Sequence, residues 1–195
     1  MIILTFDDAL LDTYEVAFPI MEQAGVKGVL FVPTDVVSGG KPFRENAVHM
    51  NIEQIREMYQ AGWEIGSHSH THPRFDKLHF DMAKWELTIS KMHLEKWGFK
   101  PVSFAFPYGH GLYTDDQVTL AHKIYKHVRT VMDLRNPNKK LIRGLPLDYG
   151  YPPRFPFLAK LRTTYVFHTI KDPDQFKEWL NHIAEKITTF QELDG

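Results

Sequence analysis

Short apolar runs and longer periodic segments alternate along the chain. The short runs are rich in β-branched and aromatic residues, as buried strands are, and they span residues 2–6, 28–32, 63–65, 102–106, 128–132 and 164–167. The longer segments repeat apolar residues every three or four positions, as amphipathic helices do, and they span residues 14–24, 52–61, 82–97, 115–125 and 173–187. Because most of the periodic segments lie between two apolar runs, the sequence predicts strands and helices in alternation.

This alternation predicts a parallel sheet with helices outside it. A single closed or nearly closed (β/α) barrel fits the length of 195 residues, and a doubly wound open sheet is the alternative. Residues 135–161 are Pro-rich and weakly periodic, which indicates loops with one short strand near Ile142. The strand total is then about seven. Nothing in the length calls for two domains, so residues 1–195 are expected to form one catalytic domain.

Some helix boundaries carry their own signals. Polar capping residues stand at the expected N-termini with Gln at the third position, in the pairs Asn51 and Gln54, Thr114 and Gln117, and Asp172 and Gln175. Pro19 falls inside the first helical pattern, where it either kinks the helix or starts a new one. The pattern leaves both possibilities open.

Composition narrows the class of protein. The hydrophobic fraction is 43% and the formal net charge is -1, as in ordinary soluble globular proteins, and nothing indicates a nucleic-acid partner. The chain has no cysteine, so a metal site must use His, carboxylate and water ligands. No stretch reaches the roughly 20 apolar residues that span a bilayer, and no signal peptide is recognisable. A cytoplasmic location is expected if Met1 is the native start.

Polar residues follow several of the expected strands, at the edge where chemistry collects in parallel α/β folds. They are Asp7 and Asp8, then His68, His70 and His72, then Pro107, Tyr108 and Gly109, and finally His168. Adjacent carboxylates point in different directions, so one can bind a metal while the other acts as a base. Simpler interpretations are a helix N-cap for the Asp pair and a structural role for His168. The common location of all these residues favours a site.

The segment GSHSHTHP places three imidazoles at alternate positions, which favours metal binding over a solvated His-rich loop. Two pairings of ligands are possible. His68 and His72 are four residues apart, as on a helical turn, whereas His68 and His70 are two apart, on one face of an extended strand. The pattern alone does not choose between them.

These segments resemble the motifs of the polysaccharide deacetylases, carbohydrate esterase family 4, also called the NodB-homology domain. TFDDA, residues 5–9, is similar to the TFDDG motif of that family, and HSHTH, residues 68–72, is similar to its second motif. The resemblance implies that Asp7 is the general base and that Asp8, His68 and His72 bind the metal. It also implies the family fold, a distorted barrel.

Two further motifs extend the resemblance over nearly the whole chain. FPYG, residues 106–109, resembles the third motif, which implies that the backbone N–H of Tyr108 stabilises the oxyanion. VFH, residues 166–168, resembles the fifth motif, which implies that His168 is the general acid and that Val166 lines the acetyl pocket.

Three positions depart from the family pattern. In many members an Arg pairs with the catalytic Asp, but this chain has Ala105 at that position. In lacking the Arg it resembles a poly-N-acetylglucosamine deacetylase-like branch. Arg143 is a candidate to supply the missing charge from another loop. The fourth motif is not recognisable, and Asp148 is only a candidate for its Asp. Ala9 replaces a Gly, which predicts a φ below zero at that residue.

The resemblance implies a metal-dependent hydrolase that removes N-acetyl groups from N-acetylglucosamine-containing saccharides. Zinc is the expected cation, with cobalt, manganese, nickel and iron(II) as alternatives. Two other functions compete with this one. The first is hydrolysis of a non-sugar C–N amide bond, and the second is non-catalytic binding of carbohydrate or metal.

Overall fold

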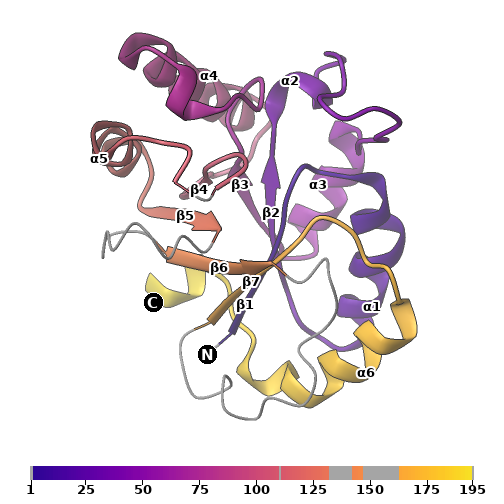
Figure 1. Cartoon of the computed structure of the whole chain (residues 1–195). Coiled ribbons are helices and arrows are strands. Elements are labelled where there is room, and N and C mark those ends of the chain that lie inside the picture. The colour runs from indigo at the N-terminus through magenta and orange to yellow at the C-terminus, as the bar shows by residue number, and fades with distance from the viewer. Residues whose placement is uncertain (1, 110, 132–141, 147–162, 195) are drawn as a thin grey trace.

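The computed structural model describes residues 2–109, 111–131, 142–146 and 163–194, and they form a closed barrel of seven parallel strands in sequence order (Figure 1). The strands are β1 Ile2–Phe6, β2 Val29–Val32, β3 Glu64–Ser67, β4 Ser103–Ala105, β5 His127–Val131, β6 Ile142–Pro146 and β7 Thr163–Phe167. β7 pairs with β1 in the register Leu4 to Tyr165, which closes the ring. The closed barrel is therefore confirmed over the doubly wound alternative, and the short strand near Ile142 is confirmed as β6.

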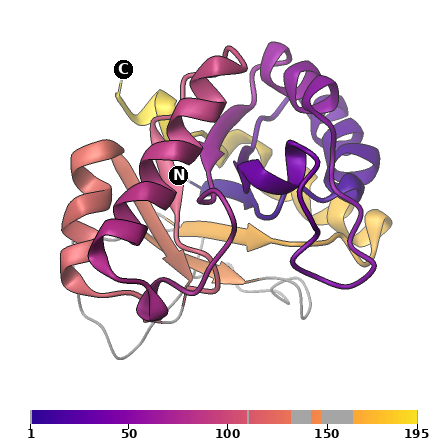
Figure 2. The ribbon, with the colours of Figure 1, turned by 90° about the horizontal axis from the view of Figure 1, so that it is seen from above.

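Helices cover the outside of the barrel (Figure 2). The α-helices are α1 Phe18–Gln23, α2 Thr34–Val37, α3 Ile52–Gln60, α4 Phe80–Lys96, α5 Asp115–Ile124 and α6 Pro173–Ile183, and the shorter helical turns are η1 Thr13–Ala17, η2 Phe75–Lys77, η4 Ala184–Lys186 and η5 Gln191–Asp194. Asn51 and Thr114 each form a reciprocal capping box with the Gln three residues later. These boxes satisfy N–H groups at the helix starts, as the sequence predicts. None of the helices among the described residues is long and apolar enough to cross a membrane.

Pro19 lies within a helical stretch that runs without a break from residue 11 to residue 23. Residues Thr13–Ala17 form a π-helical turn, and α1 starts at Phe18 with Pro19 in its first turn. The two parts form one helical path, because Ala17 and Phe18 at their boundary both have right-handed helical backbone angles and the Phe18 N–H donates to Thr13 O. The helix therefore does not restart at Pro19, and a π-helical turn precedes the proline.

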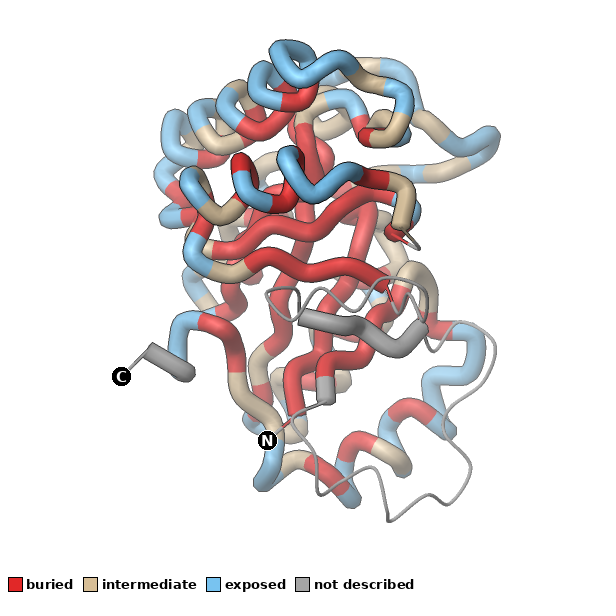
Figure 3. The backbone as a smooth tube through the Cα atoms, turned by 60° about the vertical axis from the view of Figure 1, so that its left-hand side comes forward, coloured by how far each residue is buried: buried red, intermediate tan, exposed pale blue. Residues whose placement is uncertain are grey.

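The core lies inside the barrel and between the strands and helices. Figure 3 shows the strands buried along nearly their whole described length, whereas the helices alternate between buried and exposed positions. Leu4, Leu30 and Ile65 are buried together in the largest apolar cluster, which also takes in Met21 and Leu180 from α1 and α6. Full burial of each such side chain contributes roughly 1.5–3 kcal/mol. This packing fixes the strand ends on which the polar residues stand.

Candidate metal centre

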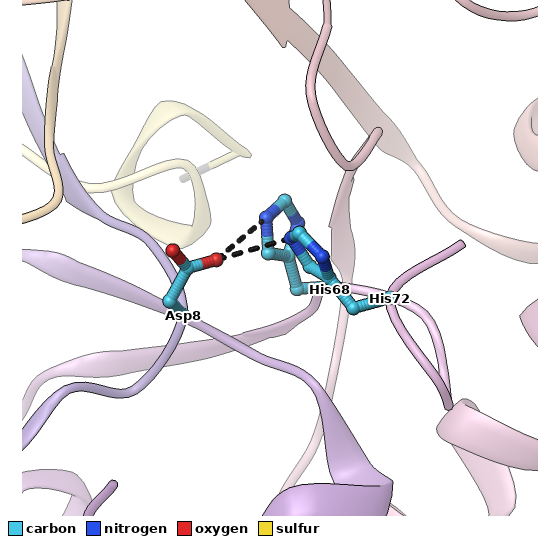
Figure 4. Close-up of side chains that lie close together, drawn as sticks. All are labelled: Asp8, His68 and His72. Atoms are coloured by element: carbon cyan, nitrogen blue, oxygen red, sulfur yellow. Dashed lines mark ion pairs between the residues drawn. The ribbon is translucent and has the colours of Figure 1, made fainter. Parts of the chain in front are cut away.

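Asp8, His68 and His72 converge at the carboxyl ends of β1 and β3 (Figure 4). One ligand atom from each residue lies within 4.8 Å of the others, and all three residues are buried. Asp8 Oδ1 is 3.5 Å from His68 Nε2 and 3.1 Å from His72 Nε2. Carboxylate and imidazole ligands in such a cluster suit zinc and related divalent cations.

The side chain of His70 points away from this cluster. Its Nδ1 is 2.8 Å from Thr34 Oγ1, and its ring contacts those of Trp85 and His93 at centroid distances of 5.2 and 5.0 Å. The pairing of His68 with His72, and not with His70, is therefore the one that forms the cluster.

Glu86 on α4 holds the loop that carries the two histidines. Its Oε2 accepts hydrogen bonds from the backbone N–H groups of His70 and Thr71, at 2.8 and 2.9 Å. Within the loop, Ser69 and His72 have φ values of 67° and 58°, a left-handed conformation that costs about 1–3 kcal/mol in a non-Gly residue. Such a conformation persists only where surrounding contacts enforce it. Glu86 supplies part of these contacts, and the hydroxyls of Ser67 and Ser69 accept from the backbone N–H groups of Ser69 and His72.

The two imidazoles are oriented in different ways. His68 Nδ1 is 2.8 Å from the carbonyl oxygen of Ala105, and because a carbonyl only accepts, Nδ1 carries the hydrogen and Nε2 is left to bind a cation. His72 Nδ1 is buried and has no hydrogen-bond partner among the described residues. The ring of His72 is instead flanked by the rings of Phe43 and Tyr108.

The protonation states fit a cation. Burial opposes ionisation of Asp8, but contacts with His68 and His72 outweigh it and hold the pKa of that carboxyl well below its usual range. Burial lowers the pKa of His72 and so favours its neutral, metal-binding form. Within the described residues, neither carboxylate oxygen of Asp8 accepts a hydrogen bond, although both are buried and Arg44 Nη2 lies 2.9 Å from Oδ2. Buried anionic oxygens that accept no hydrogen bond are costly, and a bound cation would stabilise them.

Asp7 lies beside the candidate ligand His68, and an arginine contacts the other oxygen of its carboxylate. Arg129 on β5 donates to Asp7 Oδ1, while Asp7 Oδ2 is 3.9 Å from Nε2 of both His68 and His168. Arg129 is fully buried and also lies over the ring of Phe31, at 4.9 Å from its centroid. The charge that Ala105 cannot provide thus comes from β5, and the side chain of Arg143 lies outside what the structure describes.

Sequence reasoning missed Arg129, although the sequence carries a signal for it. The residue stands in the middle of the strand HVRTV, next to Val128, where an unpaired charge would be very unfavourable once the strand is buried. A buried arginine at such a position requires an acidic partner.

The turn after β1 corrects the expectation for Ala9. Its φ is 52°, and that of Asp8 is 73°, so both residues are left-handed, in contrast to the expected φ below zero. The carbonyl oxygens of this turn accept hydrogen bonds from elsewhere: Met50 N–H binds Ala9 O at 2.8 Å, and His49 Nδ1 lies 2.8 Å from Asp8 O. These contacts enforce a conformation for which Gly is the usual residue.

The remaining candidates lie around the mouth of the site or outside the described residues. Tyr108 is 47% exposed, and its ring is 4.8 Å from that of His72. Val166 is fully buried on β7. Asp148 falls within residues 147–162, outside the described part of the chain, so its candidacy stays a prediction.

The fold and the site place the protein among the parallel (β/α) barrels that carry an Asp-His-His cluster at the carboxyl ends of their strands. Comparison with known proteins gives the family. The polysaccharide deacetylase family model matches residues 1–127. The chain belongs to this family. It is 28% identical over 122 residues to YxkH of Bacillus subtilis (strain 168), a protein assigned by name to the polysaccharide deacetylases, and the match covers 63% of this chain and 41% of YxkH.

Solved structures agree with the barrel. The deacetylase PplD of Streptococcus pyogenes, solved in complex with acetate, is 30% identical with a TM-score of 0.59, and the match covers 66% of this chain and 54% of PplD. A CE4-family pseudoenzyme from Bacillus anthracis is 17% identical with a TM-score of 0.71, over 99% of this chain and 64% of that protein. The second likeness shows the fold alone. The chain spans about half the length, or less, of the relatives YxkH and PplD.

Proposed function

We propose that the protein hydrolyses the N-acetyl groups of N-acetylglucosamine-containing saccharides, with a divalent cation held by Asp8, His68 and His72. One observation carries the proposal. The Asp7 carboxylate lies beside the three candidate ligands, and Arg129 holds only one of its two oxygens. Family membership and the names of the relatives support the reaction class.

Each polar residue of the site has a role in this reaction. The cation, expected to be zinc, supplies Lewis acidity that polarises a carbonyl oxygen and lowers the pKa of nearby water. Asp7 accepts a proton from the attacking water through Oδ2, the oxygen that faces His68 and His168. Attack on the acetamide carbon places negative charge on its oxygen, which the backbone N–H of Tyr108 stabilises.

His168 completes the reaction as the general acid. Its Nε2 is 3.9 Å from Asp7 Oδ2, so the acid and the base lie on the same side of the barrel mouth. A proton from His168 turns the departing nitrogen into a neutral amine, which is a far better leaving group than an amide anion. The products are acetate and a free glucosamine amine.

Acetate release from N-acetylglucosamine oligomers, compared with simple amides, tests the proposal. Asp7→Asn should retain zinc and lose turnover, whereas His72→Ala should lose both. His70→Ala is the matched control for metal binding, because that side chain points to Thr34 and not to the cluster. Chelation should abolish turnover, and added zinc or cobalt should restore it. Full activity in Asp7→Asn or in the chelated protein would refute the proposal.

A second candidate is a non-catalytic carbohydrate-binding or metal-binding relative. The fourth family motif is not recognisable in the sequence, and the barrel fold also occurs in the Bacillus anthracis pseudoenzyme. Saccharide binding without acetate release under any metal would favour this candidate. Release of acetate from simple amides but not from the oligomers would instead favour a non-sugar amide hydrolase.

A further inference from the structure

Residues 43–49, which follow α2, lie against the turn that carries Asp8. Leu10 and His49 form an antiparallel bridge, and Leu11 N–H donates to Val48 O at 2.8 Å. His49 Nδ1 lies 2.8 Å from the carbonyl oxygen of Asp8 itself. This outer segment is therefore fixed directly to the backbone of a candidate metal ligand.

The same segment places an aromatic ring on a second candidate ligand. The ring of Phe43 stacks on that of His72 with a centroid distance of 3.8 Å and an interplanar angle of 13°. The ring of His49 lies 5.2 Å from that of Phe43, at an interplanar angle of 54°. Phe43 thus contacts both the segment's own histidine and a histidine of the cluster.

His72 needs such a contact because it lacks the usual one. A metal-binding histidine normally donates its second ring N–H to a carbonyl or carboxylate, which fixes the plane of the ring. His68 follows this rule through Ala105 O, but His72 Nδ1 has no hydrogen-bond partner within the described residues. The torsion that turns an imidazole about its Cβ–Cγ bond is broad, so packing must set its orientation.

Arg44 makes an additional contact from the same segment. Its Nη2 is 2.9 Å from Asp8 Oδ2, and its side chain is 46% exposed. The two groups form an ion pair without a hydrogen bond, since Asp8 Oδ2 accepts no hydrogen bond from the described residues. Arg44 therefore contributes charge at the mouth of the site. Of the two rings that contact His72, Phe43 stacks on it at 3.8 Å, whereas Tyr108 lies tilted at 4.8 Å.

We propose that Phe43 is a positioning residue for the metal centre: its ring fixes the plane of the His72 imidazole by stacking, in place of the missing hydrogen bond on Nδ1. The inference rests on the proposed function, since it presumes that His72 binds a cation. Phe43 touches neither the reacting atoms nor the cation. Its effect is on metal affinity, and turnover changes only through the amount of metal bound.

Zinc affinity of the full chain, measured by competition with a chromogenic chelator, tests this role. Phe43→Ala and Phe43→Leu both remove the aromatic face, and each should weaken zinc binding by about tenfold, the lower end of the 10–100-fold loss typical of an orienting partner. Phe43→Tyr keeps the face and should stay within about twofold of the wild type. Phe80→Ala, which removes a half-exposed aromatic ring from α4, is the matched control and should leave the affinity unchanged.

Folding and metal binding are separated by two further measurements. Circular dichroism and thermal unfolding of the metal-free variants identify any that fail to fold, and Phe43→Leu keeps the proposal testable if Phe43→Ala does so. The absorption spectrum of bound cobalt should change in Phe43→Leu and not in Phe43→Tyr, because it reports ligand geometry directly.

The outcomes distinguish this inference from the proposed function. Zinc affinity in Phe43→Ala equal to that of the wild type would overturn the positioning role and leave the proposed function standing. A folded Phe43→Leu that binds zinc as tightly as the wild type would overturn ring stacking as the cause. A wild-type protein that binds no divalent cation would overturn the inference and the proposed function together.

Discussion

The guanidinium of Arg129 contacts the carboxylate of Asp7 across the interior of the barrel, although the two residues are 122 positions apart in the chain. Arg129 belongs to β5 and Asp7 directly follows β1, so closure of the barrel brings them together. Both side chains are almost completely buried. The pair fixes one oxygen of the proposed base and leaves the other directed toward His68 and His168.

Replacing Arg129 by an apolar residue should destabilise the protein. Arg129→Met fits the apolar surroundings of the Phe31 ring but leaves the buried Asp7 carboxylate without the guanidinium that neutralises its charge. Loss of one partner from a buried ion pair costs about 3–5 kcal/mol, so the free energy of unfolding of the metal-free protein should fall by that amount. Urea denaturation measures the change.

The double variant Arg129→Met with Asp7→Asn is the control for this pair. With neither charge left, it should be more stable than Arg129→Met alone, because no buried charge is unpaired. Equal stability of the single and double variants would show that the ion pair does not account for the loss.

Glu86 should prove necessary for the histidine loop because it accepts two backbone hydrogen bonds there. Glu86→Ala leaves the N–H groups of His70 and Thr71 without their acceptor, at a cost of about 1–3 kcal/mol. Glu86→Gln keeps an acceptor oxygen and should be much milder. Urea denaturation measures stability, and hydrogen exchange at the two amides should accelerate in Glu86→Ala.

The exposed Glu95 lies on the same helix and provides a control. Glu95→Ala should change neither stability nor exchange in the loop. If the amides of His70 and Thr71 exchanged at the wild-type rate in Glu86→Ala, the loop would be held by other contacts.

The barrel and much of the site were predictable from the sequence, because both depend on local patterns. Apolar runs of the right length gave six of the seven strands, and the seventh, β6, was expected near Ile142. Polar residues directly after those runs included every member of the Asp8, His68 and His72 cluster. The choice of His72 over His70 came from the family resemblance, since both spacings are compatible with metal binding.

The features that were not predicted depend on contacts between distant residues. Ala9 is left-handed because Met50, 41 positions later, binds its carbonyl oxygen, and no local pattern carries that information. The short helix α2 was not expected, because its four residues show no helical period. Arg129 could have been suspected from its place in the middle of an expected buried strand, but its partner is evident only from the closed barrel.

Glu64 predicts a pH dependence of stability at the opposite end of the barrel from the metal centre. It begins β3, where its carboxylate accepts hydrogen bonds from Ser103 Oγ at 2.5 Å and from Gln191 N–H at 2.9 Å. Burial raises the pKa of Glu64 above the value of 4.5 expected in the unfolded chain, although these hydrogen bonds oppose the shift. The folded state therefore binds more protons than the unfolded state between pH 4.5 and the raised pKa.

The sign of the effect follows from this difference in bound protons. Stability falls as the pH rises through that window, because folding then requires a proton that the unfolded chain has released. Glu64→Gln keeps a neutral, hydrogen-bonding side chain and removes this dependence. Its free energy of unfolding relative to the wild type should therefore rise from pH 4.5 to pH 7, as measured by urea denaturation at each pH. Glu53→Gln, on the exposed surface of α3, is the control and should show no such rise. If the difference in free energy of unfolding between Glu64→Gln and the wild type did not change with pH, Glu64 would titrate alike in the folded and unfolded states.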